Sequence, residues 1–245
     1  MRNCQTATEN ISTYISKILN NIIINENTCL RNTDPFFLEI KKIKESIPDR
    51  ASIVTLDVVQ LYTYILSIEG IQSCIDVLKQ NNFPDQGTDR IERLMHNVLK
   101  ENVFIFDNLY WQHVDGTPTG TSMSPAYDNL FMARLEKHII GKAINLVANK
   151  PTWWRRYIDD VIFVWPHGKT ELLKFVDYLN NNSSVKFMCD QESTENIHYL
   201  DVSIKSIGKK MDNQCIKNLN SFQHVYMRAV ATAYKYRGTL YLMNF

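Results

Sequence analysis

The sequence predicts an α+β fold in which an antiparallel sheet is backed by helices. Short runs of β-branched and aromatic residues are interspersed with segments whose apolar residues recur every three or four positions. Some of these short runs come in pairs joined by very short links, which is typical of antiparallel hairpins. The chain has 245 residues, of which 44% are hydrophobic, so it can bury a sizeable core as one large domain or two small ones.

The same periodicity assigns most of the chain to individual elements. Helices are predicted over residues 8–24, 34–45, 67–81, 88–101 and 170–181, and a further long helix from Ser124 and Pro125 onwards. Strands are predicted over residues 52–59, 103–106, 109–111, 161–165, 185–188 and 199–204, the last two as an antiparallel pair. Proline lacks the N–H that the first turn of a helix leaves unused, so Pro125 marks a helix start that Ser124 is expected to cap.

Residues 155–165 read Arg-Arg-Tyr-Ile-Asp-Asp-Val-Ile-Phe-Val-Trp. The wholly apolar end of this stretch is typical of a buried strand, and Trp153 and Trp154 just upstream suggest its partner. The simplest local structure is a β-hairpin with Asp159 and Asp160 at its tip. Two carboxylates about 4 Å apart repel each other by on the order of 4 kcal/mol at an effective dielectric of about 20, and a divalent cation would remove that cost. A solvated, Asp-rich turn is the alternative.

A further carboxylate interrupts another apolar strand. Asp57 lies within residues 52–59, where a lone acid is costly to bury unless it is paired or binds a metal. Asp57 and Asp159 are far apart in the sequence, but neighbouring central strands would bring them together. Residues 115–125, which lie between them, form a loop of small residues of the kind that lets the backbone approach a ligand. Such a carboxylate pair suits two-metal phosphoryl transfer, in which one ion activates a 3′-hydroxyl and the other holds the leaving pyrophosphate.

Three segments, in this order, resemble motifs A, B and C of reverse transcriptases. They are Leu-Asp-Val-Val-Gln-Leu-Tyr at 56–62, Gly-Thr-Pro-Thr-Gly-Thr-Ser-Met-Ser-Pro at 116–125 and Tyr-Ile-Asp-Asp at 157–160. The segments are most similar to those of Penelope-like retroelements, which Asn-Leu-Phe-Met at 129–132 and His-Tyr-Leu-Asp-Val at 198–202 also resemble. The resemblance implies an RNA-directed DNA polymerase, a nucleotidyltransferase of a retrotransposon, with a polymerase palm and partial fingers.

The resemblance also implies roles for five residues. Asp57, Asp159 and Asp160 correspond to the catalytic acids, which bind Mg²⁺ or Mn²⁺. Tyr62 corresponds to the aromatic side chain that excludes a 2′-hydroxyl and so favours deoxynucleotides, with a core aromatic after a strand as the alternative. Gly120 corresponds to the motif B glycine near the templating base and the nucleotide. The implied partners are an RNA template, a DNA primer and deoxynucleoside triphosphates.

Other parts of the sequence differ from the reverse-transcriptase pattern. The resemblance implies partial fingers in the helical segment 1–50, a palm with finger insertions at 51–205 and a truncated or degenerate basic segment at 206–245. Thumb and endonuclease domains are not recognisable, so we expect the chain alone to bind a primed template weakly and to extend it poorly. Residues 205–245 contain seven Lys or Arg and one acid. These basic residues either bind along a phosphate backbone or form a solvated end of the chain. Two other functions stay open: a catalytically inactive nucleic-acid-binding remnant of a retroelement, and an RNA-templated RNA polymerase, against which Tyr62 argues.

The composition bears on the partners and the cellular location of the chain. The net charge is +1, which by itself gives no signal for nucleic acid. The five Cys are scattered without close pairs, which favours reduced thiols in an intracellular chain, in either the nucleus or the cytoplasm. No Cys and His cluster has the spacing of zinc ligands, and the first ten residues lack an apolar signal core. There is no run of 18 apolar residues, so we expect no membrane partner. The sequence does not indicate an oligomeric state.

Overall fold

The computed structural model describes residues 8–24, 26–43, 46–48, 51–106, 109–146, 149–200, 202–207, 210–211, 216–217 and 240–242. The chain forms two compact units, each built from separate parts of the sequence. Unit 1 comprises residues 1–26, 60–137 and 237–245, and unit 2 comprises residues 27–59 and 138–236.

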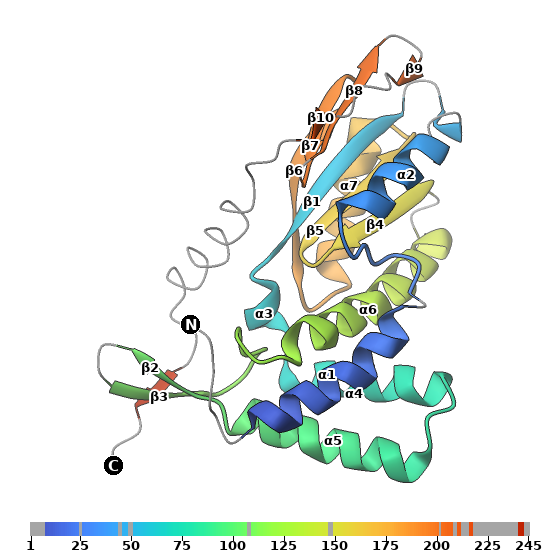
Figure 1. Cartoon of the computed structure of the whole chain (residues 1–245). Coiled ribbons are helices and arrows are strands. Elements are labelled where there is room, and N and C mark those ends of the chain that lie inside the picture. Colours follow the sequence, from blue (N-terminus) through green and yellow to red (C-terminus); the bar gives the residue numbers. More distant parts are fainter. Residues whose placement is uncertain are drawn as a thin grey trace. The chain divides into compact units, whose positions relative to one another are not determined.

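Unit 2 is built on a four-stranded antiparallel sheet (Figure 1). Its strand order is β4 (Trp153–Tyr157), β5 (Asp160–Trp165), β1 (Ser52–Val59) and β6 (Lys186–Ser193). The central strands β1 and β5 are the most buried, and β5 is buried throughout after its first residue. An apolar run fits this position because both faces of the sheet are covered. The predicted strand over 52–59, the hairpin that ends in 161–165 and the α+β fold class are therefore confirmed.

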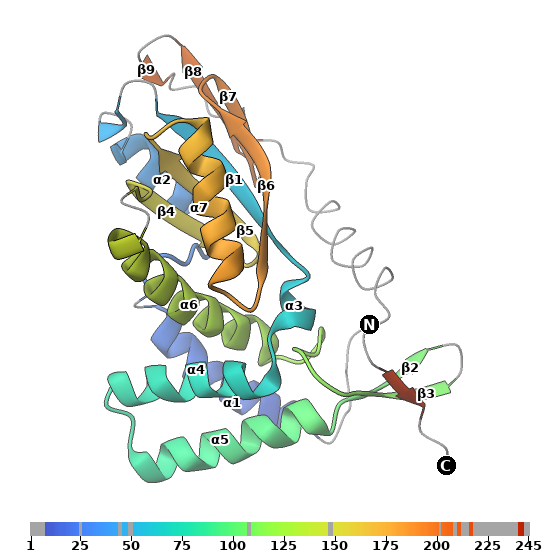
Figure 2. The same ribbon diagram turned by 180° about the vertical axis from the view of Figure 1, so that it is seen from behind.

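The helix α7 (Lys169–Asn181) lies on one face of the sheet (Figure 2). Aromatic side chains of β4 and β5 pack against it. Trp154 lies opposite Phe163 across the two strands, and their rings stack with centroids 5.1 Å apart. Phe175 of α7 contacts Trp154, Phe163 and Trp165. Alternate residues along a strand point to the same face, so Phe163 and Trp165 both reach the helix. This aromatic cluster fixes α7 on the sheet.

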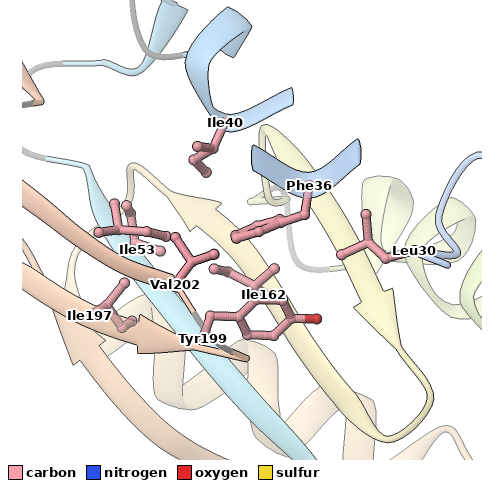
Figure 3. Packing of buried hydrophobic residues seen from close by; sticks show 9 residues of the cluster. Leu30, Phe36, Ile40, Ile53, Ile162, Ile197, Tyr199 and Val202 are labelled. Carbon is pink, nitrogen blue, oxygen red and sulfur yellow. The ribbon is translucent and has the colours of Figure 1, made fainter. Parts of the chain in front are cut away.

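The opposite face is covered by α2 (Thr33–Ile43) and by the hairpin of β7 (Asn196–Tyr199) and β8 (Val202–Ile207). One buried apolar cluster joins these elements to the central strands, as Figure 3 shows. Its members are Leu30, Phe36, Ile40, Ile53, Ile162, Ile197, Tyr199, Val202 and Ile204. Two short strands, β9 (Lys210–Met211) and β10 (Ile216–Lys217), also pair with β8. The sheet is thus held between two apolar layers.

One strand prediction is wrong. The sequence predicts a single strand over 199–204 that pairs with 185–188, but the chain turns at Leu200, whose φ is 51°. β7 ends at Tyr199, β8 begins at Val202, and these two strands pair with each other, whereas β6 pairs with β1. The apolar pattern runs through the turn without a Gly or Pro, so periodicity does not reveal the break.

Unit 1 contains most of the helices that apolar periodicity predicts. They are α1 (Glu9–Ile23), α4 (Ser67–Gln80), α5 (Asp85–Lys100) and the first part of α6 (Ser124–Leu146), with the short, unpredicted α3 (Leu61–Tyr64). The hairpin of β2 (Val103–Phe106) and β3 (Leu109–His113) is confirmed, and β11 (Leu240–Leu242) pairs with β3. The predicted turn of that hairpin, residues 107–108, lies outside the described residues.

Three further observations concern membrane-spanning helices, disulfides and the basic C-terminal segment. Among the described helices, none is long and apolar enough to cross a membrane. No disulfide joins Cys29, Cys74 and Cys189, the cysteines within the described ranges. Asp201 and most of the predicted basic segment 206–245 lie outside the described residues.

The aromatic cluster makes a prediction about stability. Phe175→Ala should lower the free energy of unfolding by about 3–5 kcal/mol, because it leaves a cavity among three aromatic rings. Leu173→Ala on the same helix is the matched control, since Leu173 is 55% exposed. Its effect should stay within about 0.5 kcal/mol. Chemical denaturation measures both, and equal losses would contradict the described packing.

Candidate active site

The β4–β5 hairpin presents the paired acids at its tip, as the sequence predicts. Tyr157 lies opposite Asp160, so Ile158 and Asp159 form a two-residue turn. β5 begins at Asp160 and continues as the buried run that ends at Trp165. The side chains of Ile158, Asp159 and Asp160 are partly exposed. The acids therefore lie where a buried strand reaches the surface.

Asp57 on β1 lies directly opposite Asp160 on β5. The Val58 N–H donates to the carbonyl oxygen of Asp159 at 3.0 Å, which ties β1 to the turn. Opposed residues of antiparallel strands point to the same face, with Cβ atoms about 4.5–5.5 Å apart. Asp57 is partly exposed, whereas the β1 residues before it are buried. Asp57 thus faces Asp160, rather than Asp159, at one end of the central strands, and Asp159 lies in the adjoining turn.

The donor chemistry of these acids fits Mg²⁺ or Mn²⁺, which both prefer oxygen ligands. No three His, Cys, Asp or Glu side chains within the described part of the chain are gathered so that they could hold a metal ion. Mg²⁺, however, is usually held by one or two carboxylates together with substrate phosphates and water, rather than by an all-protein cage. A facing carboxylate pair is compatible with a site that the substrate completes.

A β-bulge distorts the sheet beside Asp57. The register of β1 against β6 shifts between Thr55 and Leu56, which makes Asp190 the extra residue on β6. The Gln191 N–H donates to the Thr55 hydroxyl at 3.1 Å, so a side chain replaces a ladder bond at the bulge. Bulges are over-represented next to active sites, where they redirect a strand and its side chains.

The turn itself is strained. Ile158 has a φ of 55°, a left-handed conformation that a β-branched residue rarely adopts. Such a residue costs about 1–3 kcal/mol and persists only where its surroundings hold it. Arg156 Nη1 donates to the Ile158 carbonyl oxygen and the Tyr199 hydroxyl donates to the Asp160 carbonyl oxygen, each at 2.8 Å. Sequence reasoning assigned no role to Arg156 or Tyr199. The alternation of Trp154 and Arg156 on one strand face is the signal that would have predicted burial of the arginine.

Tyr62 and Gly120 belong to unit 1, where they lie in α3 and in the loop before α6. The Thr117 N–H donates to the Tyr62 carbonyl oxygen at 2.6 Å, so this loop is joined to α3. Gly116 cannot be replaced by a residue with a side chain where the loop meets α3, because its φ is 93° and a Cβ would lie 2.7 Å from the same carbonyl oxygen. Gly120 has a φ of 134° and is exposed, and the Tyr62 side chain is partly exposed. The backbone of the loop is thus closely fitted around Tyr62.

Ser124 is predicted to cap α6, but its side chain instead forms hydrogen bonds within this loop. Its hydroxyl donates to the Pro118 carbonyl oxygen at 2.5 Å and lies 2.7 Å from Thr121 Oγ1. The Tyr127 N–H in the first turn of the helix donates to the Met123 carbonyl oxygen. Tyr127, Leu130 and Phe131 of α6 are buried in the core.

Asp115 anchors the same loop to the first turn of α4. Its Oδ1 accepts hydrogen bonds from the Ser67 N–H and hydroxyl, each at 2.8 Å, and from the Gly116 N–H at 2.9 Å. Burial alone would raise the pKa of Asp115, but these hydrogen bonds, helped by His113, outweigh it and hold the pKa below its ordinary value of 3.8. The charged carboxylate satisfies donors that the start of a helix leaves open.

No family model and no curated protein matches this chain. Its fold is similar to that of solved polymerases. Apo telomerase from Candida tropicalis aligns with a TM-score of 0.63 at 11% identity, over 86% of this chain and 41% of that chain. The BmCPV RNA-dependent RNA polymerase at its elongation state aligns with a TM-score of 0.59 at 10% identity, over 86% of this chain and 20% of that chain.

A third polymerase has the same fold. An insertion-loop deletion mutant of the RNA-dependent RNA polymerase of a human picobirnavirus aligns with a TM-score of 0.58 at 10% identity, over 92% of this chain and 48% of that chain. The chain therefore spans less than half the length of each of these polymerases. At such identities the likeness establishes the fold, which is that of a polymerase palm.

The Asp115 cap makes a prediction about pH. Asp115→Asn should lower the free energy of unfolding by about 0.3–1 kcal/mol near neutral pH, because the negative charge at the start of α4 is lost. A carboxyl with a depressed pKa stabilises the fold above its unfolded-state pKa, and this contribution is lost as the pH falls through the folded-state value, below 3.8. Chemical denaturation across the acid range should show the difference between wild type and variant shrinking toward zero. A difference that is independent of pH would contradict a charged cap.

Proposed function

We propose that the chain is the palm of a reverse transcriptase, which joins deoxynucleotides to a DNA primer along an RNA template by two-metal nucleotidyl transfer. The carboxylate pair Asp57 and Asp160, with Asp159 in the adjoining turn, is the observation on which the proposal chiefly rests. The polymerase palm fold supports it, as does the order of the three segments that resemble reverse-transcriptase motifs. Telomerases of similar fold from Candida tropicalis and Candida albicans were solved with a fragment of telomeric RNA, which is consistent with an RNA partner.

The chemistry proposed for the acids is that of a metal-binding pair. Asp57 and Asp160 would supply carboxylate oxygens from facing strands, and Asp159 would supply a further one from the turn. A bound pair of Mg²⁺ or Mn²⁺ ions would lower the pKa of the primer 3′-hydroxyl and neutralise charge that develops on the transferred phosphate. The role of the protein is to position the acids. The two central strands hold them at a fixed spacing, so little reorganisation is needed when substrate binds.

The choice of deoxynucleotides over ribonucleotides is proposed to rest on Tyr62. Its ring would occupy the space that a 2′-hydroxyl needs, while Gly120 would let the loop backbone approach the nucleotide. Support for Tyr62 is that its side chain is partly exposed rather than buried in the core. An RNA-templated RNA polymerase is the second candidate, because viral RNA polymerases share the fold.

The origin and setting of the chain are part of the proposal. The segments at 129–132 and 198–202, together with the three motifs, support a retroelement of the Penelope-like class. The cysteines within the described ranges form no disulfide, which supports an intracellular location.

The proposed metal site predicts that Asp57→Asn stabilises the fold without metal and reduces the stabilisation that Mn²⁺ gives. Without metal, Asp57→Asn should stabilise the fold by up to about 1 kcal/mol, because like charges on opposed residues repel each other. With Mn²⁺ at about ten times its Kd, the wild type should gain about 1.4 kcal/mol and the variant much less. Thermal melts with and without Mn²⁺ measure both effects.

Asp177→Asn is the control for these melts. Asp177 is an exposed acid on α7 in the same unit, so its substitution should leave the response to Mn²⁺ unchanged. Equal metal responses in wild type and Asp57→Asn would rule out this pair as the ion site.

The sugar selectivity makes a separate prediction. In a chimera that joins this chain to the fingers and thumb of an active reverse transcriptase, Tyr62→Ala should raise ribonucleotide incorporation relative to deoxynucleotide incorporation by about tenfold or more. Tyr64→Ala is the matched control, since Tyr64 lies in the same short helix and is exposed. Primer extension with each nucleotide class gives the ratio. An unchanged ratio in an active chimera would leave Tyr62 as a packing residue.

A further inference from the structure

Three successive carbonyl groups of the hairpin turn each accept a hydrogen bond from a different part of unit 2. The Ile158 carbonyl accepts from Arg156 Nη1 at 2.8 Å, and the Asp159 carbonyl accepts from the Val58 N–H at 3.0 Å. The Asp160 carbonyl accepts from the Tyr199 hydroxyl at 2.8 Å. The peptide groups on both sides of Asp159 are therefore held by Arg156 and by the Val58 N–H, and the peptide group after Asp160 is held by Tyr199.

Arg156 is held firmly enough to act as such an anchor. It is 0% exposed, which is rare for arginine. Its N–H donates to the Thr28 carbonyl oxygen at 2.8 Å, and its own carbonyl accepts from the Leu30 N–H at 2.7 Å. Nη2 lies 3.3 Å from Cys29 Sγ. The segment 28–30 thus fixes the arginine backbone on the edge of the sheet while Nη1 reaches the turn.

Tyr199 approaches the turn from β7. Its side chain is 3% exposed, and its ring packs on Phe36 with centroids 5.0 Å apart. Figure 3 shows the ring within the apolar cluster beside Phe36 and Ile162. Because the ring is fixed by packing, the hydroxyl is presented to the Asp160 carbonyl in one orientation.

We propose that Arg156 and Tyr199 are positioning residues of the metal site. They hold the strained turn at Ile158, and through it they set the direction in which the carboxylates of Asp159 and Asp160 point. In these hydrogen bonds each side chain donates to a backbone carbonyl oxygen, so each acts on the backbone of the turn. This role rests on the proposed function, because a metal site is what the orientation would serve.

Tyr199→Phe tests the proposal with little disturbance, since the ring and its packing on Phe36 are kept. Tyr178→Phe is the matched control: the Tyr178 hydroxyl also donates to a backbone carbonyl oxygen in unit 2, that of Ile139, at 3.1 Å. Both variants of the full chain lose one hydrogen bond of the same kind, so their melting temperatures should fall by similar amounts.

Two measurements should separate the variants. Amide exchange of Val58, without metal, should be about fivefold faster in Tyr199→Phe, the factor that corresponds to one ordinary hydrogen bond. The Kd for Mn²⁺ should rise by a similar factor of about five. Tyr178→Phe should match the wild type in both. Equal values in the two variants would overturn the positioning role of Tyr199.

Arg156 is tested by a pair of substitutions. Arg156→Lys retains a donor that can reach the Ile158 carbonyl, and should keep more of the Mn²⁺ affinity than Arg156→Met. Equal affinities in the two variants would overturn the role of Arg156, and if neither folds, Tyr199→Phe decides the proposal. Failure of the wild type to bind Mn²⁺ would instead refute the proposed metal site, and Val58 exchange would still report whether Tyr199 holds the turn.

Discussion

The register between β1 and β5 is the constraint on which the candidate site depends. Side chains alternate between the faces of a strand, so a slip of one residue would turn Asp57 away from Asp160. Apolar packing on both faces prevents that slip: Ile162 packs in the cluster with α2, and its neighbour Phe163 packs on α7. The burial that stabilises the sheet therefore also determines which carboxylates meet at its end.

Departures from regular β geometry gather around these acids. A β-bulge lies two residues before Asp57, and Ile158, next to Asp159, has a left-handed conformation. Each departure costs free energy locally, and the surrounding hydrogen bonds and core packing offset it. In unit 1 the loop with Gly120 shows the same feature, since Gly116 adopts a positive φ where the loop meets the backbone of α3. Such exceptions to local rules are expected where a fold must hold side chains in a defined direction.

The parts of this structure that could be predicted from the sequence are those with a local pattern. The strand over 52–59 and the Asp-Asp hairpin follow from apolar runs and their short link, and the helices follow from three- and four-residue spacing. The turn at Leu200 could not be predicted, because the apolar pattern continues through it. The anchoring by Arg156 and Tyr199 depends on contacts between distant segments, which periodicity does not encode. That Asp160 faces Asp57 depends on the register between β1 and β5, two strands that are far apart in the sequence.

The central claim is that Asp57 and Asp160, facing each other across the central strands, form the divalent-cation site of a polymerase palm. Anomalous diffraction from crystals grown with Mn²⁺ and a nucleoside triphosphate tests it most directly. The account predicts an anomalous peak within about 2.5 Å of carboxylate oxygens from both residues, shared with oxygens of the triphosphate. An ordered triphosphate with no peak at these carboxylates, or a register that places Asp57 and Asp160 on opposite faces of the sheet, would contradict it.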